Sequence, residues 1–188
     1  MPLVIPRGTG DGVGFIRFKP TENAWFMSGP DGIEEFEWTS DVLIDIEQVE
    51  LGWLLLATGM RDWLPWEDKN TKEEKPEGDY KFGISVKFFS KKIFGEDDPI
   101  RELCTNTNGV VQFVEKLYAD AETSFSKGVP IVEFDGSTAM KIGKGATRVP
   151  QFTIKKFVKR PKELVNGLDT EAPKKQETAE SVDDDDEF

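Results

Sequence analysis

One segment of this 188-residue chain has the period of an amphipathic helix, and strand-like segments lie on both sides of it. In residues 109–125 apolar side chains recur every three or four positions, which predicts a helix with one buried face. Thr107 or Asn108 is a suitable N-cap residue for this helix. A single helix between groups of strands predicts a mainly β fold.

The flanking segments have the alternation and the turn residues of β-strands. Residues 80–94 form the clearest predicted strand, because apolar and polar side chains alternate there at the period of two. The charged residues 67–79 predict a loop, and residues 135–147 predict a short strand followed by a Gly-rich loop. The other predicted strands are residues 13–18, 24–27, 33–38, 128–134 and 151–160, with one or two more within residues 42–58.

These elements predict a small barrel. Five strands with one helix between the third and the fourth follow the order of the oligonucleotide-binding (OB) fold, which is the fold class that we expect. A β-sandwich with one additional helix is the alternative. The tryptophan cluster of Trp53, Trp63 and Trp66 is expected to pack in the core or against a loop.

The formal net charge of −12 conceals a basic block between two acidic ones. Residues 141–162 contain eight basic residues and no acidic residue. Beyond this block apolar residues become sparse and acidic residues prevail, which predicts a disordered acidic C-terminal tail, because such a composition buries too little surface to fold. The expected organisation is a folded domain of residues 1–162 followed by a tail of residues 163–188.

The chain contains no histidine and a single cysteine, Cys104. This composition removes the commonest general base, and it excludes an internal disulfide and a zinc site built from several thiolates. The Gly-rich residues 8–14 and 143–147 match neither a dinucleotide-binding nor a phosphate-binding loop. We therefore expect no catalytic residues, no metal and no cofactor. A metal-dependent nuclease using Asp97 and Asp98 is an alternative that this carboxylate pair leaves open.

Two predicted strands combine basic and aromatic side chains. Cations neutralise phosphates and aromatic rings stack on bases, so this combination is typical of surfaces that bind single-stranded nucleic acid. Phe89 lies on the lysine-bearing face of the first strand, and Phe157 lies on that of the second. A solvated sheet face with an incidental exposed Phe is the alternative. The predicted nucleic-acid-binding residues are Lys81, Lys87, Phe89, Lys91, Lys92, Lys141, Lys144, Arg148, Lys155, Phe157, Lys159 and Arg160.

The chain ends in DDDDEF, in which five acids precede one aromatic residue. Together with the basic strands and the expected barrel, this ending resembles the single-stranded DNA-binding proteins of bacteria and their phages. The chain lacks the Gly- or Gln-rich linker and the penultimate Pro of bacterial members, which favours the phage type and the cytoplasm of a host. No apolar stretch approaches the length of a membrane span.

The resemblance implies two roles for the tail. Its acids would occupy the basic groove when DNA is absent, at the high effective concentration that tethering provides. Its terminal Phe and carboxylate would dock on replication proteins such as a DNA polymerase, a helicase or a primase. The residues assigned to this docking segment are Asp183, Asp184, Asp185, Asp186, Glu187 and Phe188.

The leading expectation is a sequence-independent single-stranded DNA-binding protein without catalytic activity, which acts in DNA replication, recombination or repair. Its partners would be single-stranded DNA and replication proteins, with no membrane association. The alternative is a structural or interaction protein, for example a virion component, whose acidic tail keeps it soluble.

Overall fold

The computed structural model describes residues 13–39, 41–58 and 60–166, which form a mainly β fold. The strands are β1 (Gly14–Lys19), β2 (Ala24–Gly29), β3 (Gly32–Phe36), β4 (Val42–Ile44), β5 (Glu50–Ala57), β6 (Met60–Pro65), β7 (Lys81–Phe89), β8 (Ile100–Thr105), β9 (Val129–Ile142) and β10 (Gly145–Val158). The helical segments are η1 (Ile46–Gln48), α1 (Lys91–Phe94), α2 (Asn108–Ala121), η2 (Glu122–Lys127) and α3 (Lys162–Asn166).

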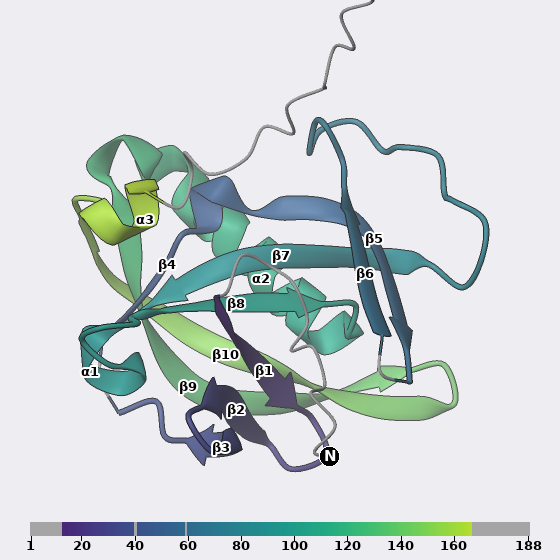
Figure 1. Cartoon of the computed structure of the whole chain (residues 1–188), viewed down its shortest axis with the longest axis horizontal. Helices are drawn as coiled ribbons and strands as arrows, with labels where there is room; N and C mark the ends of the chain where they lie inside the picture. Colours follow the sequence, from purple (N-terminus) through teal and green to yellow (C-terminus); the bar gives the residue numbers. More distant parts are fainter. Residues whose placement is uncertain (1–12, 40, 59, 167–188) are drawn as a thin grey trace, which may run out of the picture.

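The strands form one curled sheet in the order β10-β9-β4-β7-β8-β1-β2-β3, and the β5–β6 hairpin branches from it through β7 (Figure 1). The sheet is mixed, because β1 and β8 run parallel whereas the other neighbours run antiparallel. The accumulated twist of successive strands gives the sheet the form of a half-barrel. The described residues thus contain more strands than the five of the predicted barrel.

Trp25 on β2 lies at the centre of the hydrophobic core and is only 2% exposed. The buried side chains of α2 belong to the same apolar cluster as the inward-facing side chains of the sheet, so the helix covers the inner side of the half-barrel. Large buried aromatic side chains contribute strongly to such cores. The rings with centroids within 6.1 Å of the Trp25 indole belong to Phe18, Trp38, Phe88, Phe113 and Phe134.

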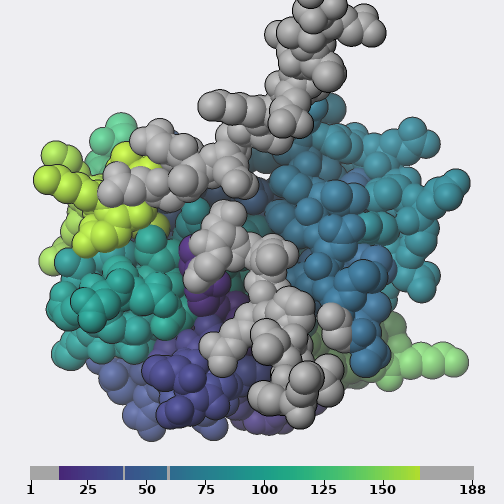
Figure 2. Space-filling model, viewed as in Figure 1, coloured from purple at the N-terminus to yellow at the C-terminus, as the bar shows by residue number. Residues whose placement is uncertain are grey.

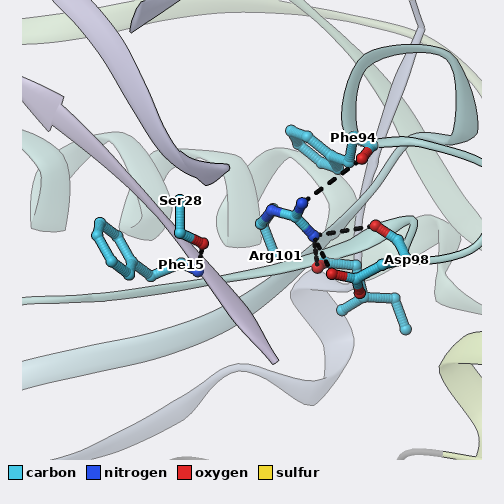
Figure 3. Close-up of polar contacts among 6 residues, drawn as sticks. Phe15, Ser28, Phe94, Asp98 and Arg101 are labelled. Carbon is cyan, nitrogen blue, oxygen red and sulfur yellow. Dashed lines mark hydrogen bonds and ion pairs between the residues drawn. The ribbon is translucent and has the colours of Figure 1, made fainter. Parts of the chain in front are cut away.

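The parallel pairing of β1 with β8 surrounds a buried arginine (Figure 3). Arg101 donates through Nη1 to a carboxylate oxygen of Asp98 at 2.9 Å and to the carbonyl oxygen of Ile100 at 2.7 Å. Its partner in the register is Gly14, where a β-carbon would lie 2.8 Å from Nε of Arg101. The close approach of β1 to β8 therefore requires glycine at position 14.

The helix that the sequence predicts is confirmed, since α2 continues into η2 as far as Lys127. Strand β8 is not predicted, because Arg101 occupies an inward position where the alternation would place an apolar residue. Strand β7 ends at Phe89, because the side chain of Ser90 accepts a hydrogen bond from the Ile93 amide at 3.3 Å and caps α1. The predicted Gly-rich loop shrinks to a tight turn at Gly143, which joins two long strands.

The packed structure continues beyond the boundary predicted at Lys162. Leu164 on α3 is only 1% exposed, whereas its neighbour Val165 is 43% exposed. Glu163 forms an ion pair of 3.0 Å with Lys91 on α1. The first helix residues that the sequence assigns to the tail therefore belong to the folded body.

We expect the substitution Leu164→Ala to lower the free energy of unfolding by about 2–3 kcal/mol, because it removes a fully buried side chain. The matched substitution Val165→Ala should change it by less than about 0.5 kcal/mol, since that side chain is largely in solvent. Urea unfolding followed by tryptophan fluorescence measures both values. Equal effects of the two substitutions would show that α3 does not pack on the body in solution.

Candidate nucleic-acid interface

The register of the strands divides their side chains between two faces. On β7, Ile84, Val86 and Phe88 point into the core, so the alternate residues point outward. Paired residues of neighbouring strands share a face, which extends this outward surface onto β5, β6 and β8. We call it the outer face; its residues are Glu50, Gly52, Leu54, Leu56, Arg61, Trp63, Lys81, Gly83, Ser85, Lys87, Glu102 and Cys104.

Trp63 lies across the outer face on a floor of two glycines. Its indole reaches from β6 over β5 to β7, because β-carbons built at Gly52 and Gly83 would lie 2.8 Å and 3.4 Å from its ring atoms. Gly52 and Gly83 are themselves paired in the register. A β-carbon at position 52 would be too close to the ring, and one at position 83 would just touch it, so the half-buried indole lies directly on both glycines.

Carboxylates and one guanidinium surround this indole. The Trp63 Nε1 donates to a carboxylate oxygen of Glu50 at 3.4 Å. Glu102 accepts a hydrogen bond from the Ser85 hydroxyl at 2.6 Å and one from Arg61 at 3.4 Å. The outer face therefore holds an aromatic ring bonded to one carboxylate, and a second carboxylate bonded to a hydroxyl and a cation.

The single cysteine also lies on the outer face. Burial raises the pKa of the Cys104 thiol to about 12, and the nearby guanidinium of Arg61 opposes this rise only in part. The thiol is therefore protonated at neutral pH and is a poor nucleophile.

Trp63 is not among the residues predicted for the interface, because the sequence groups it with Trp53 and Trp66 in one expected cluster. Trp53 is 7% exposed, and its ring packs against Trp66 at 5.7 Å on the opposite side of the strands, as expected for the cluster. Trp63 lies on β6, whereas Trp53 lies on β5. Trp53 pairs with Leu64, the neighbour of Trp63, so the two indoles lie on opposite faces of the sheet, and only the pairing of β6 with β5 shows this. Glycines at both 52 and 83 were the available signal.

A pocket of about 290 Å³ opens on the inner side, between α2 and the strands β5 and β7. Its walls are mainly apolar and include Leu51, Phe82 and Tyr118. Lys69 crosses its edge, where its Nζ donates to the Glu47 carbonyl oxygen at 2.7 Å and lies 5.1 Å from the Tyr118 ring centroid.

Several predicted basic residues are accessible on the surface. Lys81 lies at the start of β7 and is exposed, whereas Lys87 is half-buried. The tip of the β9–β10 hairpin projects from the body at the lower right of Figure 2, in light green. Arg148 is held against that hairpin, because its Nε donates to the Ser137 hydroxyl at 2.7 Å. The predicted cations Lys92, Lys141, Lys144 and Lys159 are also exposed.

Phe89 is not available for stacking, contrary to the sequence prediction. It points away from the main core, but it is only 8% exposed. Its partners in the register are Leu43 and Ile100, and Leu43 also pairs with Ile131. Ile100, Phe89, Leu43 and Ile131 therefore form an apolar row across four strands at this end of the outward surface.

Phe157 is also placed differently from the prediction, because β10 contains a β-bulge. Ile154 pairs with Val132 and Lys156 pairs with Ile131, so Lys155 is an extra residue in the ladder. A bulge of one residue reverses the faces of all the residues that follow. Phe157 consequently packs against the core instead of sharing a face with the lysines.

Other predicted cations are engaged with acids. Lys91 pairs with Glu163 at 3.0 Å, and Lys155 lies 3.7 Å from Glu133. Arg160 contacts Asp45 at 2.8 Å and Glu47 at 2.9 Å. Burial raises the pKa of Asp45, and Arg160 opposes this rise.

The predicted docking segment, Asp183 to Phe188, lies outside the described residues. Within the residues that the structure describes, no group of three or more carboxylate and thiol side chains is placed to hold a metal ion. No helix of the described ranges has both the length and the apolar character needed to cross a membrane. Comparisons with protein-family models, with curated proteins and with solved structures found no match.

The buried Asp45 predicts a pH dependence of stability. Because its pKa is raised on folding, the folded chain keeps this proton at pH values where the unfolded chain, with a pKa near 3.8, has released it. Its contribution to stability is therefore greatest below that pH and falls as the pH rises. In urea unfolding, the stability of the wild type relative to Asp45→Asn should decrease as the pH rises above the unfolded pKa near 3.8. A difference that stays constant or grows would contradict this assignment.

Proposed function

We propose that this chain is a sequence-independent single-stranded DNA-binding protein without catalytic activity, which coats exposed strands during DNA replication, recombination or repair. The observation that carries the proposal is the indole of Trp63, held across Gly52 and Gly83 beside Arg61. An aromatic ring supported by a sheet, with a guanidinium nearby, is suited to stacking on a base while a neighbouring phosphate is neutralised.

The order of the strands supports this proposal. The run β10-β9-β4-β7-β8 contains five neighbouring strands, and α2 lies between β8 and β9 along the chain. In chain order these five strands are β4, β7, β8, β9 and β10, so the helix follows the third of them, as in an OB fold. The parallel partner of β8 here is β1, which extends the sheet beyond those five strands.

The likeness to an OB fold also supports the position of the site. OB folds bind oligonucleotides on the face of their second and third strands, between the loops that join strands one and two and strands four and five. In this chain the corresponding strands are β7 and β8, and the two connections are the β5–β6 hairpin with its following loop and the β9–β10 tip. Both connections extend toward the right-hand side of Figure 1.

The acidic C-terminal residues complete the proposal. Residues 163–188 carry far more acidic than basic residues, so they would compete with DNA for the cations when no DNA is bound. We propose that Phe188 and its carboxylate dock on replication proteins such as a polymerase, a helicase or a primase, in the cytoplasm of a host cell. Because Leu164 is packed in the body, this regulatory segment begins after α3.

A structural or interaction protein is the second candidate. It is favoured by the ion pairs that already engage Lys91, Lys155 and Arg160, and by the carboxylates Glu50 and Glu102 on the outer face. Such a protein would bind no polynucleotide under any salt condition.

A titration with labelled oligo-dT separates these functions. The full chain and a chain that ends at Asn166 should both bind, the shorter one more tightly, and affinity should fall steeply with salt because cations are released from the DNA. Fluorescence anisotropy at low and high salt measures both effects. Absence of binding by both chains, or equal affinity for duplex DNA, would contradict the proposal.

Removal of one exposed cation at the hairpin tip should weaken binding. We expect Lys144→Ala to lower the affinity for oligo-dT and to reduce the salt slope by roughly one unit, the effect of losing one phosphate contact. Lys116→Ala is the matched control, because this lysine lies on α2 and pairs with Asp120 at 3.2 Å. The assignment of the tip would fail if both variants lost affinity to the same extent.

A further inference from the structure

The carboxylate of Glu50 lies at the Nε1 edge of the Trp63 indole, next to the ring on which a base would stack. One carboxylate oxygen accepts the Trp63 Nε1 hydrogen bond at 3.4 Å, and the other has no hydrogen-bond partner among the described residues. Glu50 is exposed, so this second oxygen is accessible from solvent. Each carboxylate oxygen has two lone pairs, so both oxygens of Glu50 can still accept hydrogen bonds from a ligand.

A carboxylate in this position is unfavourable for a site that only neutralises phosphates. Its negative charge repels the DNA backbone, and Glu102 adds a second one nearby on the same face. Ser85 and Arg61 both donate hydrogen bonds to Glu102, whereas the Trp63 indole alone donates to the Glu50 carboxylate among the described residues. In the folded protein the remaining lone pairs of Glu50 are thus open to solvent or to a donor on a ligand.

The edges of the four bases differ in how well they satisfy such an acceptor. Unstacked bases present their Watson–Crick edges to protein groups. Guanine presents two adjacent donors, its N1–H and its exocyclic amino group, which match the oxygens of one carboxylate. Cytosine and adenine present one amino group beside an acceptor. Thymine presents a single N–H between two carbonyl oxygens, which a carboxylate repels.

We propose that Glu50 reads the base stacked on Trp63 and gives this site a preference for guanine over thymine. The inference rests on the proposed function, because it assumes that single-stranded DNA occupies the outer face. The backbone contacts made by cations remain independent of sequence, so the preference is confined to one nucleotide in the site. Glu50 is a specificity-determining residue in this assignment, and Trp63 supplies the stacking energy.

The test compares labelled oligonucleotides of about 12 nucleotides, within the usual site size of such folds. The first is all thymine, the second has one central guanine, and the third has inosine at that position, which lacks the exocyclic amino group. A single guanine avoids quadruplex formation. The proteins are the full-length wild type, Glu50→Gln, Trp63→Ala and the control Glu122→Gln, which removes one exposed acid on η2.

For the wild type and for Glu122→Gln we expect the guanine oligonucleotide to bind about fivefold or more tightly than the thymine one, with inosine between them. Glu50→Gln should lose this preference while binding all-thymine DNA as tightly as the wild type or more tightly, because a repulsive charge is gone. Trp63→Ala should lose affinity for all three oligonucleotides. A role of Glu50 in holding the indole alone would instead weaken all three equally in Glu50→Gln.

The two proposals fail in different ways. If the wild type binds thymine and guanine oligonucleotides equally, or if Glu50→Gln keeps the guanine preference, this inference is overturned and the proposed function stands. If the folded wild type binds none of the oligonucleotides, the proposed function and this inference are both overturned.

Discussion

The packing around Trp25 is the interaction on which the rest of this structure depends. Its indole touches rings from β1, β7, β9 and α2, so it joins the N-terminal hairpin to the central strands and the helix. Because this cluster commits the inner side of β7 to the core, polar and charged residues of β7 are left on the opposite side. The position of the outer face follows from that division, and so does the placement of Trp63 above Gly52 and Gly83.

The periodicity of apolar residues was sufficient to predict which side chains are buried in elements that contain no bulge or other irregularity. The helix α2 and the inward residues of β7 are such cases, and both occur as predicted. Phe157 was misplaced because the extra residue at Lys155 reverses the phase of β10, which no single-strand pattern reveals. Phe89 was misplaced because its burial depends on Leu43, a partner far away in the sequence. The face on which the β6 side chains lie depends on the pairing of β6 with β5, which the pattern of a single strand does not contain.

The basic block illustrates how charge that is segregated along a sequence becomes mixed in space. No acid occurs between residues 141 and 162, yet the fold brings Asp45 and Glu47 to Arg160 and Glu133 to Lys155. The exposed pair of Lys155 and Glu133 contributes little to stability, but both sets of ion pairs reduce the local potential that a polyanion experiences. The exposed lysines at the β9–β10 tip therefore carry more weight in the proposed interface than the number of cations in the block suggests.

The parallel ladder between β1 and β8 has a consequence for the order in which the chain acquires its structure. Gly14 and Arg101 are neighbours in that ladder, although β2 to β7 lie between them in the sequence. Contacts of such long range form slowly, because a large loop has to close before they provide any stabilisation. On the ribosome, the β1–β3 meander is made first and must wait, with Trp25 uncovered, until β8 and α2 emerge. The aromatic side chain that later organises the core is thus one that stays without its later partners during synthesis.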